Sequence, residues 1–441
     1  MKQTRSFTIR EYGYLLDGGD IDDHNVVSIP RSAFKNLLDN IHHENDNSHI
    51  EPFIKLTSYN RKPALKVQNY VGVLRTPCGS QIEILPKLYN KSKSEDAIEA
   101  ARYQLLEMLR TLRNSPFKQG GRADIRDARM PLLEVYITQF LSLVNQLVKR
   151  GVRSDYLRVQ ANVKYLKGRL LVSQEIRKNT FHKERFYIEY EEYQINRPAN
   201  RLIKSALLLV SNLSRFYRNQ RLARELSFVF EAVPVSKDIK ADFMKVRIDR
   251  AMGYYSDVIN WCRLLLNGYG LTATDGNFNT ISLLYPMERI FEDYVTHSLR
   301  LNIGSYFPES CTLSTQVNKR SLVDNHIDKP IFNLRPDLLI QKEGENICVM
   351  DTKWKLIDSS DRSNKYGISQ ADMYQLYAYG HKYLRGAKEK RLMLIYPKTD
   401  TFCKPLPVFT YEDGFELEVV PFDISNKKLI TCTRMKNAFI N

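Results

Sequence analysis

Several common sequence features are missing from this chain, and each absence excludes a class of protein. No apolar run approaches the roughly 18 to 20 residues that a helix needs to cross a bilayer. The first residues, MKQTRSFTIREYG, lack the apolar core of a signal peptide. No GxxxxGK[ST] motif occurs, so the chain has no phosphate-cradling loop of its own. We therefore expect a cytoplasmic protein that contacts no membrane and binds no nucleotide itself.

Clustered metal-binding or disulfide-forming residues are also missing. The six cysteines are scattered singly, at positions 78, 262, 311, 348, 403 and 432, with no CxxC pair and no histidine at zinc spacing. This argues against a disulfide framework or a structural zinc site and favours reduced, buried thiols. His42 and His43 lie in the polar run IHHENDNSHI, which is typical of a solvated loop. No histidine has the surroundings of a catalytic base.

Positive charge is present in excess. Lys and Arg number 66 against 50 Asp and Glu, which gives a formal net charge of +16. Such a surplus favours a polyanionic partner, most commonly nucleic acid, but it does not separate an enzyme from a binding module. The composition is otherwise that of a globular protein, with 43% hydrophobic and 26% charged residues.

The length of 441 residues predicts two or three domains. Residues 1–114 are the expected first domain, which is β-rich because apolar and polar positions alternate between turn signals before a helical pattern over residues 97–113. Residues 115–280 begin with a polar, basic loop and then read as a mostly helical region. Residues 281–441 alternate helices with apolar strands, which indicates an α/β domain with a mixed sheet. The expected class is a multidomain α+β protein.

A basic stripe lies in the helical region. Arginines recur every three residues, with Phe216 and Tyr217 interleaved, at positions 215, 218, 221 and 224. The stripe is either a solvated helix face or a face that binds phosphates or a partner, and the sequence favours neither.

The stretch RPDLLIQKEGENICVMDTKWK, residues 335–355, contains charges where a hydrophobic strand pair is expected. Two apolar strands joined by EGEN predict an antiparallel hairpin. Folding around Gly344 brings Asp337 opposite Asp351, and Lys353 shares a face with Asp351 by the two-residue period. A shift of one residue would put the two aspartates on opposite faces, so their convergence depends on the register.

Two converged carboxylates suit a hard divalent cation such as magnesium. That cation could polarise a scissile phosphate and lower the pKa of an attacking water, while a lysine stabilises the developing charge. The preceding helix offers a third carboxylate at Glu292, and the following helix carries Gln375 and Tyr379 four residues apart on one face. Taken singly, Glu292 also fits a solvated helix charge and Tyr379 a core aromatic.

Together these residues resemble the PD-(D/E)xK nuclease fold, in its branch with a QxxxY helix. Further blocks, in order along the chain, resemble the McrC family: IREYG (9–13), GSQIEILPKLY (79–89), PLLEVYI (131–137), LKGRL (166–170), YEEYQINRPANRLIK (190–204) and MERIFEDYV (287–295). The chain is long for this family, and residues 18–50 and 356–368 are candidate insertions or loops.

This resemblance implies an Mg2+-dependent DNA endonuclease subunit of a restriction system that acts on DNA carrying 5-methylcytosine. Asp337 and Asp351 would bind the metal with help from Glu292. Lys353 would stabilise the transition state or position the water, and Gln375 with Tyr379 would orient the site. A restriction-endonuclease-like nuclease domain would then occupy residues 281–441.

The resemblance also implies partners. A McrB-like AAA+ GTPase hexamer would recognise and move double-stranded DNA, and this chain would dock on the ring and stimulate its GTPase. The first domain and the basic helical region would form the docking part. The family blocks there include Glu134, Asn196, Asn200 and Arg201, and the last two could equally be helix caps or structural hydrogen bonders.

Two alternatives stay open. A self-sufficient restriction nuclease, reading DNA with its own N-terminal region, would cut with magnesium and no nucleotide. A non-cleaving regulator of a GTPase ring would be expected to have lost one member of the Asp337, Asp351 and Lys353 set, which is intact here.

Overall fold

The computed structural model describes residues 5–19, 23, 25–44, 53–87, 94–112, 117, 129–266, 281–308, 310–387 and 390–431. The chain divides into two compact units. The first unit combines residues 1–129, 274–279 and 284–441, and the second combines residues 130–273 and 280–283. The side chains of His42 and His43, residue Cys432 and nearly all of the predicted loop at 115–129 lie outside the described residues.

Two four-stranded sheets form the N-terminal part of the first unit. One sheet has the order β1 (Ser6–Arg10), β7 (Gln81–Leu85), β6 (Tyr70–Arg75) and β11 (Ile281–Pro286). The other has the order β3 (Val26–Ile29), β2 (Tyr14–Asp17), β5 (Lys62–Val67) and β4 (Ile54–Tyr59). Two helices accompany them, α1 (Arg31–Glu44) and α2 (Glu95–Leu109). The predicted β-rich character of this region is confirmed.

The C-terminal part of the first unit follows α10 (Met287–Leu301) and is built on a mixed sheet. Its order is β12 (Cys311–Thr315), β15 (Leu338–Lys342), β16 (Glu345–Thr352), β17 (Arg391–Pro397), β19 (Glu416–Asp423) and β18 (Phe409–Thr410), and β20 (Lys428–Leu429) pairs with β19. The pairs β16–β17 and β17–β19 are parallel, and the other pairs are antiparallel. The predicted mixed sheet is therefore observed.

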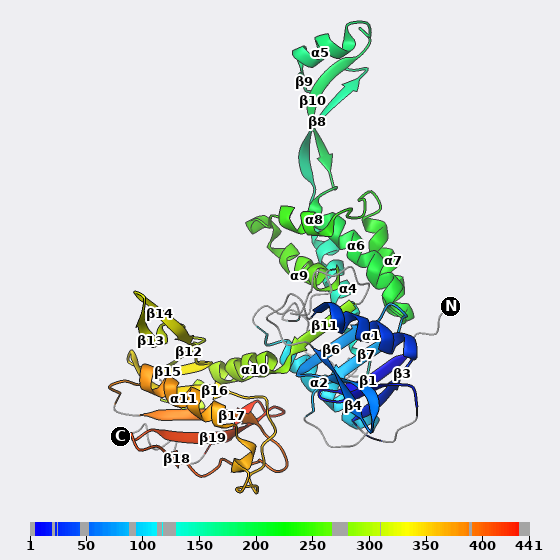
Figure 1. Cartoon of the computed structure of the whole chain (residues 1–441). Coiled ribbons are helices and arrows are strands. Elements are labelled where there is room, and N and C mark those ends of the chain that lie inside the picture. The colour runs from blue at the N-terminus through cyan, green and yellow to red at the C-terminus, as the bar shows by residue number, and fades with distance from the viewer. Residues whose placement is uncertain are drawn as a thin grey trace. The chain divides into compact units, whose positions relative to one another are not determined.

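One helix lies on this sheet and connects its two central strands. α11 (Gln370–Tyr383) follows β16, packs against β16 and β17, and precedes β17 (Figure 1). Its inner face joins a core that includes Leu376, Tyr379, Leu392 and Leu417. A separate hairpin, β13 (Arg320–His326) with β14 (Lys329–Leu334), precedes β15. This strand–helix–strand connection places α11 beside the end of the aspartate hairpin.

The second unit is helical, as predicted, with one addition. Its helices are α4 (Leu132–Arg150), α6 (Pro198–Leu213), α7 (Tyr217–Val229), α8 (Ile239–Lys245) and α9 (Ser256–Leu266). Between α4 and α6 the chain forms a ribbon of three strands, ordered β8 (Asp155–Val163), β10 (Phe186–Gln194) and β9 (Arg169–Leu170), with the short helix α5 (Val172–Asn179) (Figure 1). This ribbon was not predicted, since residues 115–280 were expected to be mostly helical.

All described helices are too short or too polar to span a membrane. This finding concerns the described residues alone.

A tight contact at Gly380 gives a stability prediction for the α11 layer. A Cβ atom at this position would lie 2.9 Å from Leu392 Cδ2 and 2.9 Å from Phe415 Cε1. Alanine favours helices over glycine by about 1 kcal/mol, but overpacking a core costs about 1–3 kcal/mol. We expect Gly380→Ala to lower the free energy of unfolding, measured by urea denaturation.

The matched control is Gly304→Ala, because nothing lies within 4 Å of a Cβ built there. This variant should unfold like the wild type. A Gly380→Ala protein more stable than the wild type would show that helix propensity outweighs packing at this interface.

Candidate active site

The register of the aspartate hairpin depends on an irregularity in β16. The turn is a two-residue loop, with Lys342 paired to Glu345 and positive φ at both Glu343 and Gly344. Gln341 pairs with Asn346, but Ile340 pairs with Cys348, so Ile347 is an extra residue in β16. Beyond this bulge Leu338 pairs with Met350.

Continuing this pairing by one residue sets Asp337 opposite Asp351, as predicted. The hydrogen bonds at the strand ends agree with that placement. The backbone nitrogen and the hydroxyl of Thr352 each donate to Asp337 Oδ2, both at 2.8 Å. The backbone nitrogen of Gln316 donates to the Asp337 carbonyl at 2.9 Å. The two aspartates therefore converge at one end of the hairpin.

Asp351 is buried, with 3% of its surface exposed. Burial raises its pKa to about 7, and the neighbouring Asp337 carboxylate acts in the same direction, while Lys353 opposes them. The ammonium of Lys353 lies 2.6 Å from Asp351 Oδ2. This oxygen accepts no well-formed hydrogen bond from the described residues. Burial by itself would lower the pKa of Lys353, but Asp351 outweighs it and raises that pKa.

The predicted α11 residues join the same cluster. Lys353 Nζ donates to Gln375 Oε1 at 2.9 Å, and Gln375 Nε2 donates to the Tyr379 hydroxyl at 2.7 Å. Tyr379 then donates to the carbonyl of Arg335 at 3.3 Å, two residues before Asp337. Tyr379 is also part of the buried core, so it is both a core aromatic and a member of this cluster.

Glu292 is a half-buried residue of α10, and its carboxylate accepts a hydrogen bond from a neighbouring side chain. Gln316 Nε2 donates to Glu292 Oε1 at 2.6 Å, and Arg335 donates to the other end of the Gln316 amide. Across the described residues, no group of three or more His, Cys, Asp and Glu side chains gathers closely enough to hold a metal. The role of Glu292 as a metal ligand therefore stays a prediction.

Asp337 and Asp351 suit a hard divalent cation. Carboxylate oxygens are the ligands that magnesium prefers, and one of these oxygens is buried without a well-formed hydrogen bond. A cation there would also stabilise the charged form of Asp351, which burial disfavours.

A buried cluster behind the hairpin was missed by sequence reasoning. Trp354, the residue after Lys353, donates from Nε1 to Glu11 Oε1 at 2.8 Å. The backbone nitrogen of Lys87 donates to the same oxygen at 3.0 Å. Burial raises the pKa of Glu11 to about 6, and the Trp354 ring packs on Phe291 at 5.2 Å. A signal was available, because Glu11 and Lys87 lie in the blocks IREYG and GSQIEILPKLY.

A second missed pair lies beside the hairpin end. Lys355 Nζ donates to Asp372 Oδ2 at 2.6 Å, and the Tyr396 hydroxyl donates to the same oxygen at 3.3 Å. Asp372 is in the first turn of α11, so this bond ties the chain after β16 to the start of the helix that carries Gln375.

The family-block residues of the second unit make internal bonds. Glu134 accepts from the Ser214 hydroxyl at 2.7 Å and from Asn219 Nδ2 at 2.9 Å. Asn200 Nδ2 donates to the carbonyls of Arg153 and Ile195, at 2.9 and 2.8 Å. These contacts favour a structural role for Glu134 and Asn200.

Arg201 also bonds within the second unit. It forms a two-pronged ion pair with Asp242, at 3.0 and 2.6 Å, and donates to Asn196 Oδ1 at 2.9 Å. The reading of Arg201 as a structural hydrogen bonder is therefore favoured.

The four stripe arginines are exposed on or beside α7. Arg221 pairs with Glu225 at 2.8 Å, and Arg224 Nε donates to the Gln220 carbonyl at 3.2 Å. Local bonds thus account for Arg221 and Arg224. They do not decide between a solvated and a binding face for the stripe.

A protein-family model matches most of the chain. The model of a family described as "McrBC 5-methylcytosine restriction system component" matches residues 65–397, which is more than half of the chain. No curated protein matches the chain.

Two solved structures are similar in fold. A chain from the half-complex of a tetradecameric assembly of Thermococcus gammatolerans McrB AAA+ hexamers with bound McrC is 18% identical, with a TM-score of 0.66 and 98% of both chains covered. A chain from the cryo-EM structure of the Thermococcus gammatolerans McrBC complex is 19% identical, with a TM-score of 0.48, and covers 68% of this chain and 88% of that chain. At these identities the first match supports the fold alone.

The raised pKa of Asp351 predicts a pH dependence of stability without metal. This pKa is about 7 in the folded chain against an ordinary value of 3.8. Between these values the folded state holds a proton that the unfolded state has released, so the free energy of unfolding falls as pH rises. Relative to Asp351→Asn, which lacks this titration, the wild type should lose up to about 1.4 kcal/mol per pH unit from about pH 4 to pH 7.

The measurement is urea denaturation followed by the fluorescence of Trp354, in a Trp261→Phe background that removes the other tryptophan. Asp328→Asn, at an exposed position, serves as the control. A constant difference between wild type and Asp351→Asn across this pH range would show that the environment of Asp351 does not disfavour its charge.

Proposed function

Because this chain belongs to the McrBC family of 5-methylcytosine restriction system components, we propose that it is the Mg2+-dependent DNA endonuclease subunit of such a system. The observation that carries the proposal is the convergence of two carboxylates and a lysine at one end of a hairpin. Asp337 directly precedes β15, Asp351 lies in the neighbouring strand β16, and Lys353 Nζ is 2.6 Å from Asp351. Two carboxylates and an ammonium can supply the metal ligands and the positive charge used in metal-assisted phosphodiester hydrolysis.

Each residue has a defined task in this proposal. Asp337 and Asp351 would hold Mg2+, with Glu292 assisting from α10. Bound Mg2+ would supply positive charge that offsets the negative charge building on the scissile phosphate. Lys353 adds a second positive charge and positions the attacking water.

Gln375 and Tyr379 fix the place of that lysine. Gln375 accepts from Lys353 and is itself held by Tyr379, which is anchored on the Arg335 carbonyl. Gln375 is exposed and Tyr379 is buried, so this chain of hydrogen bonds connects the solvent-facing site to the core. The ammonium therefore reaches the site in one fixed position, as transition-state stabilisation requires.

A partner would supply nucleotide hydrolysis and DNA movement, since this sequence has no phosphate-binding loop. We propose a McrB-like AAA+ GTPase hexamer, on the support of the fold shared with a chain from the McrB hexamer assembly with bound McrC. Double-stranded DNA would be the substrate of the complex. The surplus of 16 positive charges fits that substrate.

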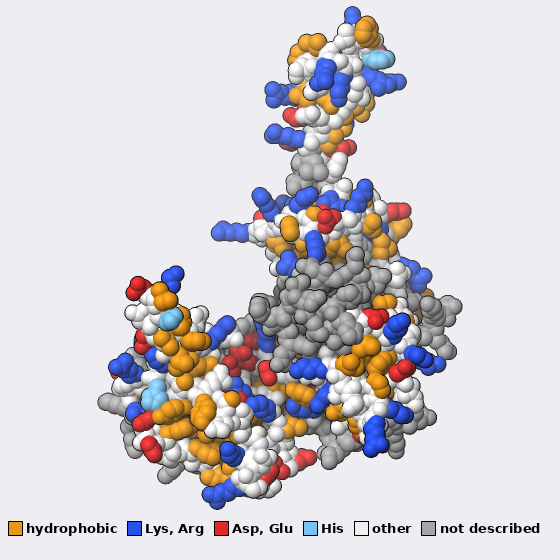
Figure 2. Space-filling view, viewed as in Figure 1, with side chains coloured by type: hydrophobic (Ala, Val, Ile, Leu, Met, Phe, Trp, Pro, Cys, Tyr) orange, Lys and Arg blue, Asp and Glu red, His pale blue; other side chains and the backbone are white. Residues whose placement is uncertain are grey.

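The ribbon of the second unit is the docking surface that we propose. Apolar side chains stand exposed on it, at Tyr165, Leu166, Val172, Ile176 and Phe181. Phe181 is 93% exposed and Ile176 is 68% exposed. Figure 2 shows apolar and basic side chains mixed on the ribbon. Exposed apolar clusters of this kind mark protein interfaces, and this one lies within the region predicted to dock.

Lys353→Ala tests the catalytic assignment. Cleavage of methylated DNA, assayed with the partner, GTP and Mg2+, should fall about 100-fold or more, because a charge aimed at the transition state is lost. Stimulation of the partner GTPase should persist, because Lys353 is remote in sequence from the docking ribbon. Lys382→Ala is the control, since that lysine bonds Asp324 instead.

Three outcomes would overturn parts of this proposal. Cleavage that survives both Lys353→Ala and Asp351→Ala would contradict the catalytic assignment. Cleavage by the purified wild type with Mg2+ but no partner or nucleotide would identify a self-sufficient nuclease. GTPase stimulation without any cleavage by the wild type would identify a regulator.

Phe181→Asp combined with Ile176→Asp tests the docking surface. Buried aromatic anchors at interfaces contribute about 2 kcal/mol or more, so the concentration of chain that half-stimulates the partner GTPase should rise about 30-fold. Circular dichroism should be unchanged, since both side chains are exposed. Phe332→Asp, at a position 69% exposed on β14, is the control because it lies outside the region expected to dock. An equal rise for both variants would contradict docking at the ribbon.

A further inference from the structure

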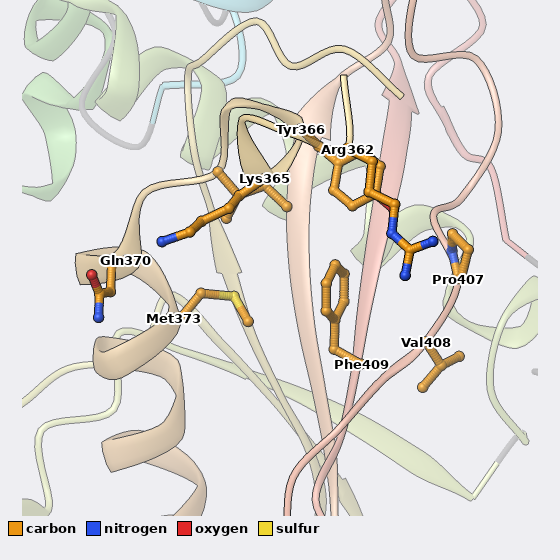
Figure 3. Close-up of a pocket in the computed structure, with 9 residues that line it drawn as sticks. Arg362, Lys365, Tyr366, Gln370, Met373, Pro407, Val408 and Phe409 are labelled. Atoms are coloured by element: carbon orange, nitrogen blue, oxygen red, sulfur yellow. The ribbon is translucent and has the colours of Figure 1, made fainter. Parts of the chain in front are cut away.

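A cavity of about 550 Å3 lies beside α11 and has no role in the proposed reaction. It is formed by the segment after Lys353, the first turn of α11 and residues 407–409 (Figure 3). The first of these segments includes residues 356–368, which the sequence marks as a candidate insertion. The volume falls in the range of roughly 300–1,000 Å3 that is typical of ligand sites.

The floor of this cavity is apolar and partly aromatic. Met373 and Phe409 point into it (Figure 3). The Tyr366 ring stands nearly perpendicular to that of Phe409, with centroids 6.3 Å apart and an interplanar angle of 80°. Aromatic rings and a thioether pack well on a flat, polarisable ring.

Two cations border the floor. Arg362 and Lys365 are exposed and line the cavity, and neither side chain forms an ion pair or hydrogen bond with any of the described residues. In the view of Figure 3 their charged ends lie on opposite sides of Met373 and Phe409. The lining contains no acidic residue, so the cavity favours an anionic ligand with a flat apolar body.

The acidic side chains nearby in sequence have other partners. Asp361 accepts from the Ser363 hydroxyl at 2.8 Å and from the Asn364 backbone at 3.2 Å. Asp372 is bonded to Lys355. Arg362 and Lys365 are therefore available to bind an anionic ligand.

The loop that presents these cations is held in place. The backbone nitrogen of Tyr366 donates to the Asp361 carbonyl at 2.7 Å, and that of Asp358 donates to the Tyr366 carbonyl at 3.1 Å. Ser359 bonds Thr401 through its backbone nitrogen, at 3.0 Å. Lys365 and Tyr366 both adopt left-handed φ, at 54° and 59°, which side chains other than glycine adopt at a cost. The loop therefore presents Lys365 and Tyr366 in one preformed arrangement.

The cavity and the proposed cutting site lie on the same sheet and share the helix α11. Met373 lines the cavity and Gln375 bonds Lys353, but side chains two residues apart on a helix point about 200° apart around its axis. Phe409 lies in β18, three strands from Asp351 in the order β16, β17, β19 and β18, which is about 14 Å across the sheet. A ligand in the cavity is therefore separate from a phosphate at Asp351.

We propose that this pocket binds one unpaired nucleotide of the substrate DNA, at a distance from the scissile phosphate. Its base would pack on Phe409 and Tyr366, and the phosphates on its two sides would contact Arg362 and Lys365. The identity of the ligand as DNA rests on the proposed function. A base must leave the duplex stack to enter such a pocket, so the pocket selects locally opened DNA.

The first test measures binding without cleavage. Full-length chain is titrated onto a short fluorescein-labelled single-stranded oligonucleotide in EDTA, and the dissociation constant is read from anisotropy at several salt concentrations. Arg362→Ala with Lys365→Ala should weaken binding about 10-fold at low salt. It should also lower the slope of log K against log salt by about 1.4, since each phosphate contact on a single strand contributes about 0.7.

Arg385→Ala is the matched control, because this exposed arginine follows the far end of α11. Its loss should change binding much less. Equal affinities and equal salt slopes for the double variant and the control would overturn the proposal.

The second test locates the base. An oligonucleotide carrying 4-thiothymine is crosslinked to the full-length chain by light, again in EDTA, and the modified peptide is identified by mass spectrometry. Crosslinks to peptides containing Tyr366 or Phe409 would support the pocket. Crosslinks confined to other peptides would overturn it.

Both tests omit metal, so they are independent of catalysis. A chain that crosslinks at Tyr366 or Phe409 but never cuts DNA would refute the nuclease proposal and retain the pocket. A chain that cuts DNA with its partner, while the double variant binds the oligonucleotide as tightly as the wild type, would refute the pocket alone.

Discussion

One extra residue in a strand sets the geometry on which the candidate site depends. A hairpin with a two-residue turn at Glu343 and Gly344 would by itself pair Asp337 with Met350 and leave Asp351 one position beyond it. The bulge at Ile347 shifts the pairing by one residue and sets the two aspartates opposite each other. Because side chains alternate along a strand, this shift decides whether the carboxylates share a face.

The rest of the site is arranged around that register. Lys353 follows Asp351 by two residues and points to the same side, where its ammonium donates a hydrogen bond to Gln375 Oε1. The next residue, Trp354, points the other way and is bonded to Glu11 in the N-terminal part of the same unit. The strand end is therefore held on both sides, by a helix in front and by a buried carboxylate behind. A residue 343 positions earlier in the sequence thus fixes the segment that carries the proposed catalytic lysine.

Local patterns made part of this architecture predictable. Two short apolar strands around a turn identified the hairpin, and four-residue spacing placed Gln375 and Tyr379 on one helix face. The predicted register, with Asp337 opposite Asp351, was right, but the reason was incomplete. The prediction assumed pairing symmetric about Gly344, whereas the turn pairs Lys342 with Glu345 and is one residue out of that symmetry. The bulge in β16 adds the missing residue.

The ribbon of the second unit did leave a local signal, because residues 157–163 of β8, LRVQANV, alternate apolar and polar side chains, and the helical interpretation of this region overlooked it. Other features left no local trace. The bond between Glu11 and Trp354 joins distant parts of the chain and follows from tertiary packing alone. The cavity beside α11 depends on left-handed backbone at Lys365 and Tyr366. Neither residue is a glycine or an asparagine, the types that favour this conformation, so the sequence did not predict it.

The charge balance at the hairpin connects stability to the proposed chemistry. Asp351 is buried beside a second carboxylate, and the single ammonium at 2.6 Å does not restore its ordinary pKa. A folded chain accepts such an arrangement where function requires it, since replacing the carboxylate by a neutral group would remove the desolvation cost. In the proposed metal site, a bound cation would relieve this deficit of positive charge, so the burial of Asp351 would add to the affinity for the cation.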